Sequence, residues 1–255
     1  MILSQRLLSV IIFVVFILGG ISLMLFPIYV VPISVSLLGI IIIFLVRFFL
    51  SADVGVFERI LYIVSLSFFF LSGIVFFTFL ERSLWQYVTL FGVAVVAAVY
   101  IENAYKFLWK SSDYHFSALS NVSSYMYLLT IFFVTVSVFN LRFFFGISTL
   151  VVMIVTTVFG LFLFYAYLWS QKVVPTSSRW FAISFALLFV EMIYILNLWP
   201  HIPLVKGVVT LAFVYGMMQM LILSIRDSFQ TSKVMRILGI VTFVLVIVLV
   251  TAQWK

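Results

Sequence analysis

One carboxylate interrupts the apolar stretch FVEMIYILNLWPHIP, which runs from Phe189 to Pro203. This residue, Glu191, falls near the middle of an apolar run over 180–199 that is long enough to cross a membrane. A charge at the centre of a membrane helix costs on the order of 3 kcal/mol. Such residues mark ion or proton relays and substrate contacts, or they anchor helices by hydrogen bonds. Both kinds of chemistry stay open for Glu191.

The neighbours of Glu191 define a candidate intramembrane polar site. Helical spacing places Ser184 and Tyr194 on the same face, which we expect to point into the interior of a helical bundle. Beyond the PHIP turn, Thr210 should lie at a similar depth. The long side chain of Lys206 could reach inward from nearer the membrane surface.

A second candidate lies in the stretch VYIENAYK. Glu102 and Lys106 are four residues apart, with the acid first, which favours an ion pair on a helix. With Asn103 they form either a solvated helix end or the cytoplasmic mouth of a path leading to Glu191. The second alternative would connect both candidate sites.

Signatures of intramembrane enzymes are missing from the sequence. The chain has no cysteine, no H-E-x-x-H motif and no Gly-rich phosphate loop. His115 and His201 fall in connections on opposite sides of the predicted membrane, so they cannot share a haem or a metal. The three aspartates fall on three separate connections: Asp53, Asp113 and Asp227. We therefore expect no metal and no cofactor, and an enzyme is the third-ranked function.

Composition explains why these polar residues are so few. Of 255 residues, 66% are hydrophobic and 8% are charged, whereas a soluble domain is about 45–50% apolar and about 25% charged. Lipid must therefore be the solvent for most of the chain. The net charge of +7 comes from basic residues spread singly between apolar runs, which indicates membrane orientation rather than nucleic-acid binding.

Nine apolar runs have the length of a membrane helix. They predict an all-α integral membrane protein with one domain over 1–255, built from four tight hairpins and a C-terminal helix. We expect the spans at 7–26, 29–46, 60–80, 86–105, 122–140, 146–168, 180–199, 204–224 and 237–254. The runs are continuous rather than alternating, which excludes the strands of a membrane barrel.

Basic residues predict the orientation of the spans. Ten of the 14 Lys and Arg residues fall on the side that holds the N-terminus and the longer connections. The sequence therefore predicts a cytoplasmic N-terminus and an external C-terminus in a plasma or inner membrane. We read the first run as a membrane helix rather than a cleaved signal peptide, because it is long enough to span and no A-x-A pattern follows.

The C-terminal third, from WFAISFALLFVEMIYILNLWPHIPLVKGVV to RDSFQTSKVMRILGIVTFVLVIVLVTAQWK, carries a mid-span acid, a Trp-Pro ending, a basic segment and a closing TAQW. In these features it resembles uncharacterised polytopic membrane proteins of small-genome, Patescibacteria-like candidate-phylum bacteria. The resemblance implies a bacterial inner-membrane setting and no known activity.

Two functions remain from different classes. The first is permeation or transport of a small solute or lipid through Glu191, which needs a cavity that reaches the carboxylate. The second is a non-catalytic scaffold or assembly partner of envelope machinery, in which packing closes off Glu191. An enzyme should instead bring several polar residues together at one membrane face. The expected partners are the lipid bilayer and either another membrane protein or further copies of the chain, without nucleic acid.

Overall fold

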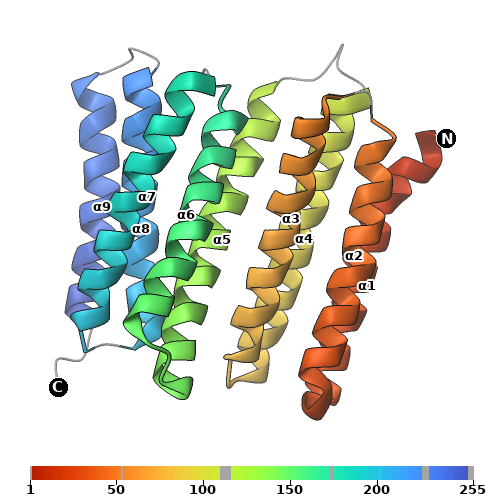
Figure 1. Ribbon diagram of the computed structural model, residues 1–255, viewed down its shortest axis with the longest axis horizontal. Helices are drawn as coiled ribbons and strands as arrows, with labels where there is room; N and C mark the ends of the chain where they lie inside the picture. Colours follow the sequence, from red (N-terminus) through yellow and green to blue (C-terminus); the bar gives the residue numbers. More distant parts are fainter. Residues whose placement is uncertain are drawn as a thin grey trace. The chain divides into compact units, whose positions relative to one another are not determined.

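The computed structural model describes residues 2–52, 54–109, 116–172, 175–200, 202–225 and 230–251. These residues form nine α-helices and one 3₁₀ turn (Figure 1). The elements are α1 (Ile2–Leu25), η1 (Pro27–Tyr29), α2 (Val30–Leu50), α3 (Val56–Thr78), α4 (Ser83–Trp109), α5 (Phe116–Phe145), α6 (Thr149–Ser170), α7 (Pro175–Leu198), α8 (Pro203–Ile225) and α9 (Thr231–Thr251). All nine helices are long and apolar enough to cross a membrane, which confirms the predicted fold class.

The helices end where the sequence supplies turn residues rather than where hydrophobicity stops. Pro27 and Pro203 each stand at the start of a helical segment, where a missing backbone N–H does no harm. Gly146 has a φ of +65°, a conformation that suits glycine, in the turn between α5 and α6. By contrast, α4 continues to Trp109 and α9 begins at Thr231, both beyond the predicted spans.

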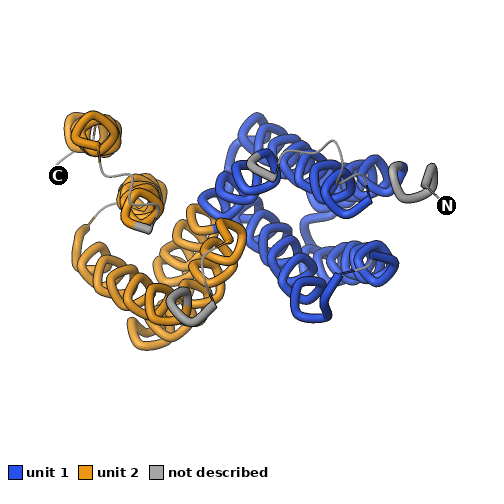
Figure 2. Tube along the Cα trace, turned by 90° about the horizontal axis from the view of Figure 1, so that it is seen from above, with its two compact units in different colours: residues 1–130 blue, residues 131–255 orange. Residues whose placement is uncertain are grey.

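The chain forms two compact units, which divide within α5 (Figure 2). Unit 1 comprises residues 1–130. In it α1 packs against both α2 and α4, and α2 packs against α3. An added Cβ at Gly20 of α1 would lie 2.0 Å from a Leu90 methyl of α4, so glycine allows this close approach. The core is aromatic, and the rings of Phe49 and Tyr62 stack with their centroids 5.1 Å apart.

Unit 2 comprises residues 131–255. Here α7 packs far more extensively against α6 than against α8, and α8 packs against α9. Gly160 of α6 makes room for the Phe189 ring of α7, since an added Cβ would lie 3.0 Å from it. Consecutive helices run in opposite directions, as short connections require (Figure 1). The length of a connection nevertheless does not predict how much two helices pack.

Candidate functional site

The carboxylate of Glu191 lies on an exposed face of α7. The prediction that it faces the bundle interior is therefore wrong. Leu187 and Leu188 of the same face are 59% and 46% exposed, and Tyr194 is 44% exposed. The opposite face of α7 is buried through Ala182, Ala186, Phe189, Ile193 and Leu196. Glu191 makes no hydrogen bond or ion pair with any residue in the described ranges.

The other members of the predicted polar site separate into two groups. Ser184 is exposed on α7, beside Glu191 and Tyr194. Thr210 is fully buried in α8, where its hydroxyl donates a hydrogen bond to the Lys206 carbonyl at 2.8 Å. Lys206 is also buried, with 8% of its surface exposed. The five predicted residues thus belong to an exposed face of α7 and a buried face of α8.

Lys206 lies against α5 within unit 2. Its ammonium nitrogen is 4.8 Å from the centroid of the Phe139 ring, a cation–π contact. It also experiences repulsion from the positive charge of Arg142, one helical turn beyond Phe139. The close approach of α8 to α5 depends on Gly207, because an added Cβ there would lie 2.2 Å from a Val136 methyl.

Arg142 begins a chain of polar contacts that the sequence analysis missed. Its guanidinium donates a hydrogen bond to the hydroxyl oxygen of Thr149. The side-chain amide of Asn197 donates to the same oxygen at 3.3 Å. Together with Lys206, these residues form a group at one end of unit 2 that we call the cationic cluster. It contains two cations and two neutral polar side chains.

Local sequence explains why these side chains meet. Gly146 turns the chain after α5, and the Ser148 hydroxyl accepts a hydrogen bond from the Val151 N–H at the start of α6. This turn places Thr149 opposite Arg142. Asn197 comes from the last turn of α7 and Lys206 from the first turn of α8. Polar residues at both ends of two short connections were the available signal in the sequence.

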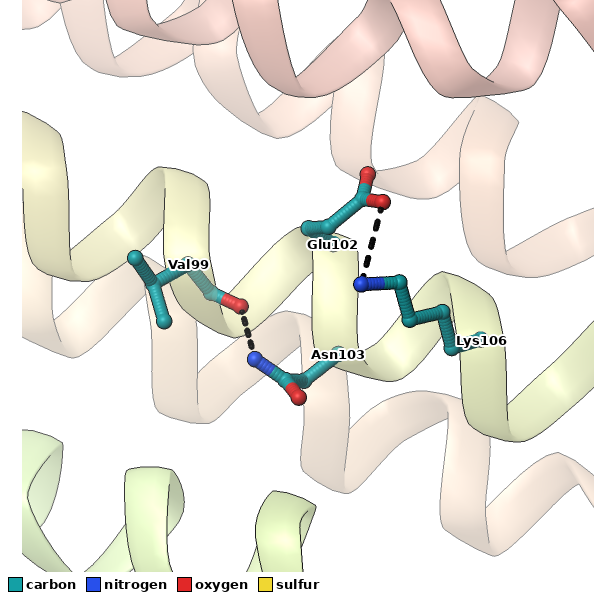
Figure 3. Close-up of polar contacts among 4 residues, drawn as sticks. All are labelled: Val99, Glu102, Asn103 and Lys106. Atoms are coloured by element: carbon teal, nitrogen blue, oxygen red, sulfur yellow. Dashed lines mark hydrogen bonds and ion pairs between the residues drawn. The ribbon is translucent and has the colours of Figure 1, made fainter. Parts of the chain in front are cut away.

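Glu102 and Asn103 form a separate local arrangement on α4 of unit 1 (Figure 3). The Glu102 carboxylate lies 3.5 Å from the Lys106 ammonium, and the two side chains are 24% and 46% exposed. The Asn103 side-chain amide donates to the Val99 carbonyl at 2.7 Å. These contacts stay within one helix, as expected for a partly solvated helix end.

A hollow in unit 1 lies between α1 and α2 and has a volume of about 600 Å³. Its walls are mostly aliphatic and aromatic, with Ser22, Tyr29 and Ser36 as the polar contributors. The Ser22 hydroxyl already donates to the Leu18 carbonyl at 2.9 Å.

Comparisons with known proteins add no family: no protein-family model, curated protein or solved structure matches the chain. The resemblance to candidate-phylum membrane proteins stays a prediction. Five residues considered for metal or haem binding lie outside the described residues: Asp53, Asp113, His115, His201 and Asp227. Within the described ranges, no three His, Asp or Glu residues lie together in a way that could hold a metal ion.

Proposed function

We propose that this multi-pass membrane protein is a non-catalytic assembly partner, which docks on another membrane protein through the α7 face that carries Glu191. The observation behind this proposal is the exposure of Glu191 on a face that is otherwise largely aliphatic. Contact between this carboxylate and lipid acyl chains would be energetically costly at this position. A partner helix can supply a polar contact and cover the surrounding leucines.

The depth of Glu191 defines the chemistry of that partner. At a rise of about 1.5 Å per residue, Glu191 lies roughly 10 Å along the axis from Leu198, the last residue of α7. With α7 spanning the bilayer as far as Leu198, we expect the carboxylate well inside a hydrocarbon core of about 30 Å. No Lys or Arg of the chain falls in the middle of a predicted span. Charge complementarity therefore favours a different protein with a Lys, Arg or His at this depth over a second copy.

Transport through Glu191 is the weaker candidate. A relay needs polar groups or water leading to the carboxylate. Three leucines on the same exposed face, Leu187, Leu188 and Leu198, offer neither. Ser184 and Tyr194 supply two hydroxyls on this face, but Glu191 has no hydrogen bond to either. The face is better suited to helix contact than to conduction.

Photocrosslinking in native membranes tests the proposal. A photoreactive residue at Leu187 should give one defined heterologous adduct, and the same residue at Phe243 on the exposed surface of α9 serves as the control. Glu191→Leu should abolish the Leu187 adduct, whereas Glu191→Gln should weaken it. Mass spectrometry of the adduct should identify a membrane protein with a basic residue in mid-span.

Exchanging the two charges between the partners then tests whether Glu191 is responsible for the contact at Leu187. Glu191→Lys should prevent the adduct, and replacing the partner's basic residue by Glu should restore it. If the adduct still forms with Glu191→Leu, the carboxylate does not contribute to the interface. An adduct between two copies of the chain would show that this face forms a homo-oligomer and does not bind a different protein. Proton or solute flux that Glu191→Gln abolishes in vesicles of the purified protein would instead favour transport.

A further inference from the structure

We propose that the cationic cluster of Arg142, Thr149, Asn197 and Lys206 binds a phosphate group. This site is independent of the α7 face discussed above. The group could belong to a lipid headgroup or to free phosphate, since both present the same negatively charged oxygens. Arg142 and Lys206 would supply the charge, and Thr149 would supply a hydroxyl donor.

Hydrogen-bond accounting within the cluster leaves an excess of donors. The Thr149 oxygen accepts from both Arg142 and Asn197, which occupies its two lone pairs. Its own hydroxyl proton is therefore available to an acceptor. Thr149 is also the one hydrogen-bond acceptor that the Arg142 side chain reaches in the described ranges, although a guanidinium has five N–H donors. The side-chain oxygen of Asn197 is a buried acceptor without a donor among the described residues. Even with this oxygen counted, the cluster can donate several more hydrogen bonds than it can accept.

Lys206 provides a second, independent observation. Its side chain is more than nine-tenths buried, yet its ammonium has no hydrogen-bond acceptor and no ion pair among the described residues. The Phe139 ring covers it on one side, and the charge of Arg142 repels it. Buried charges in proteins are normally paired. An anion between Arg142 and Lys206 would neutralise both.

The described part of unit 2 offers no counter-ion for these two cations. Glu191 is the one carboxylate among the described residues of unit 2, and it forms no ion pair with either cation. The first turns of α6 and α8 lie at the same end of the unit, where the positive ends of the two helix dipoles add positive potential. Phe143, Phe144 and Phe145 are strongly exposed next to Arg142. Such a combination suits the boundary between hydrocarbon and lipid headgroups.

Lipid binding to the full-length protein in dodecyl maltoside tests the site. Native mass spectrometry would compare dioleoyl phosphatidylglycerol with dioleoylglycerol, which has the same tails without the phosphate. We expect the phosphate-bearing lipid to bind about tenfold more tightly or better, the scale of a charge-assisted contact. Inorganic phosphate added at millimolar concentration identifies the source. If inorganic phosphate displaces the lipid, the site accepts the free phosphate group. If it does not, the site requires a phosphate group that is attached to a lipid.

Substitutions test whether the phosphate-bearing lipid binds at the cationic cluster. Arg142→Gln and Lys206→Gln should each weaken binding of the phosphate-bearing lipid by about tenfold. Arg82→Gln is the matched control, because Arg82 is an exposed cation in the α3–α4 connection of unit 1. Arg142→Lys keeps the charge and should retain part of the affinity, even if Arg142→Gln folds poorly. Equal binding of both lipids by the parent protein, without an effect of phosphate, would overturn the proposal. A loss no larger than that of Arg82→Gln would do the same.

Discussion

Two carboxylates of the membrane helices, Glu102 in unit 1 and Glu191 in unit 2, differ in how their charge is accommodated. Glu102 lies near the end of α4 and pairs with Lys106 one turn away, at 3.5 Å. Glu191 lies well within α7, is exposed, and has no partner in the described part of the chain. The same functional group is thus locally compensated in one unit and uncompensated in the other.

The cations repeat this contrast. Lys106 is half exposed and paired, whereas Lys206 is buried, unpaired and close to a second cation. A charge at a helix end is easily hydrated or paired, so it carries little information about function. Uncompensated charges inside a membrane unit are costly and need an external reason. Unit 2 is therefore where we expect partners and ligands to bind.

The largest expected effect concerns insertion of the two acid-bearing helices. Glu191→Leu should make membrane insertion of α7 more favourable by roughly 3 kcal/mol, because it removes a charge from deep within the span. Glu102→Leu should favour insertion of α4 by well under half of that, because Glu102 lies near the helix end. A glycosylation-based insertion assay of the isolated segments measures both values. Equal gains for the two helices would mean that Glu102 and Glu191 sit at the same depth.

Span positions were predictable because hydropathy summed over about 20 residues measures the free energy of insertion directly. The orientation of Glu191 was not, since both faces of α7 are apolar and no amphipathic pattern identifies the buried one. What buries one face is its fit to α6, where Gly160 admits Phe189. The spacing of Ala182 and Ala186, four residues apart, was an available signal for that contact.

The cationic cluster was predictable only in part. Lys206 appeared among the candidates because it could reach inward, and the structure shows it buried. Its neighbours come from three other helices, α5, α6 and α7. Their meeting depends on turn geometry and on the close approach of α8 to α5 at Gly207, which single-residue patterns do not encode. A search for polar residues at adjacent helix ends would have found Arg142, Thr149 and Asn197 together.

The next largest effect tests how unit 2 positions Lys206. Gly207→Ala should lower the free energy of unfolding by about 1–3 kcal/mol, because the new methyl would overlap the stiff Val136 side chain. Gly239→Ala in α9 is the control, since an added Cβ there meets nothing within 4 Å. It should be neutral or stabilising by up to about 1 kcal/mol, the helix preference of alanine over glycine. Denaturation in mixed micelles measures both, and equal behaviour of the two variants would contradict the close approach of α8 to α5.

A smaller effect of opposite sign is expected for Lys206. In phosphate-free detergent, Lys206→Met should raise the free energy of unfolding by about 1 kcal/mol, because relief from burial and from Arg142 outweighs the lost contact with Phe139. Lys106→Met in unit 1 should not be stabilising, since it removes a paired and half-exposed cation. Thermal unfolding of both variants beside the parent protein makes the comparison. A destabilising Lys206→Met would show that the chain itself already compensates this cation.

The smallest effect belongs to the compensated pair itself. Glu102→Gln should lower the free energy of unfolding by about 0.3–0.5 kcal/mol, the usual contribution of a helical pair spaced by four residues. Added salt should shrink this loss, because Lys106 is 46% exposed and its charge is screened. Glu191→Gln should have no measurable effect on the isolated chain, since its carboxylate has no partner to lose in the described structure. It should become costly only when the partner protein is present. The free energy of unfolding of both variants can be measured at low and high salt, for the isolated chain and for the purified complex. A charge that stabilises the chain itself affects the isolated chain, whereas a charge that binds the partner affects only the complex.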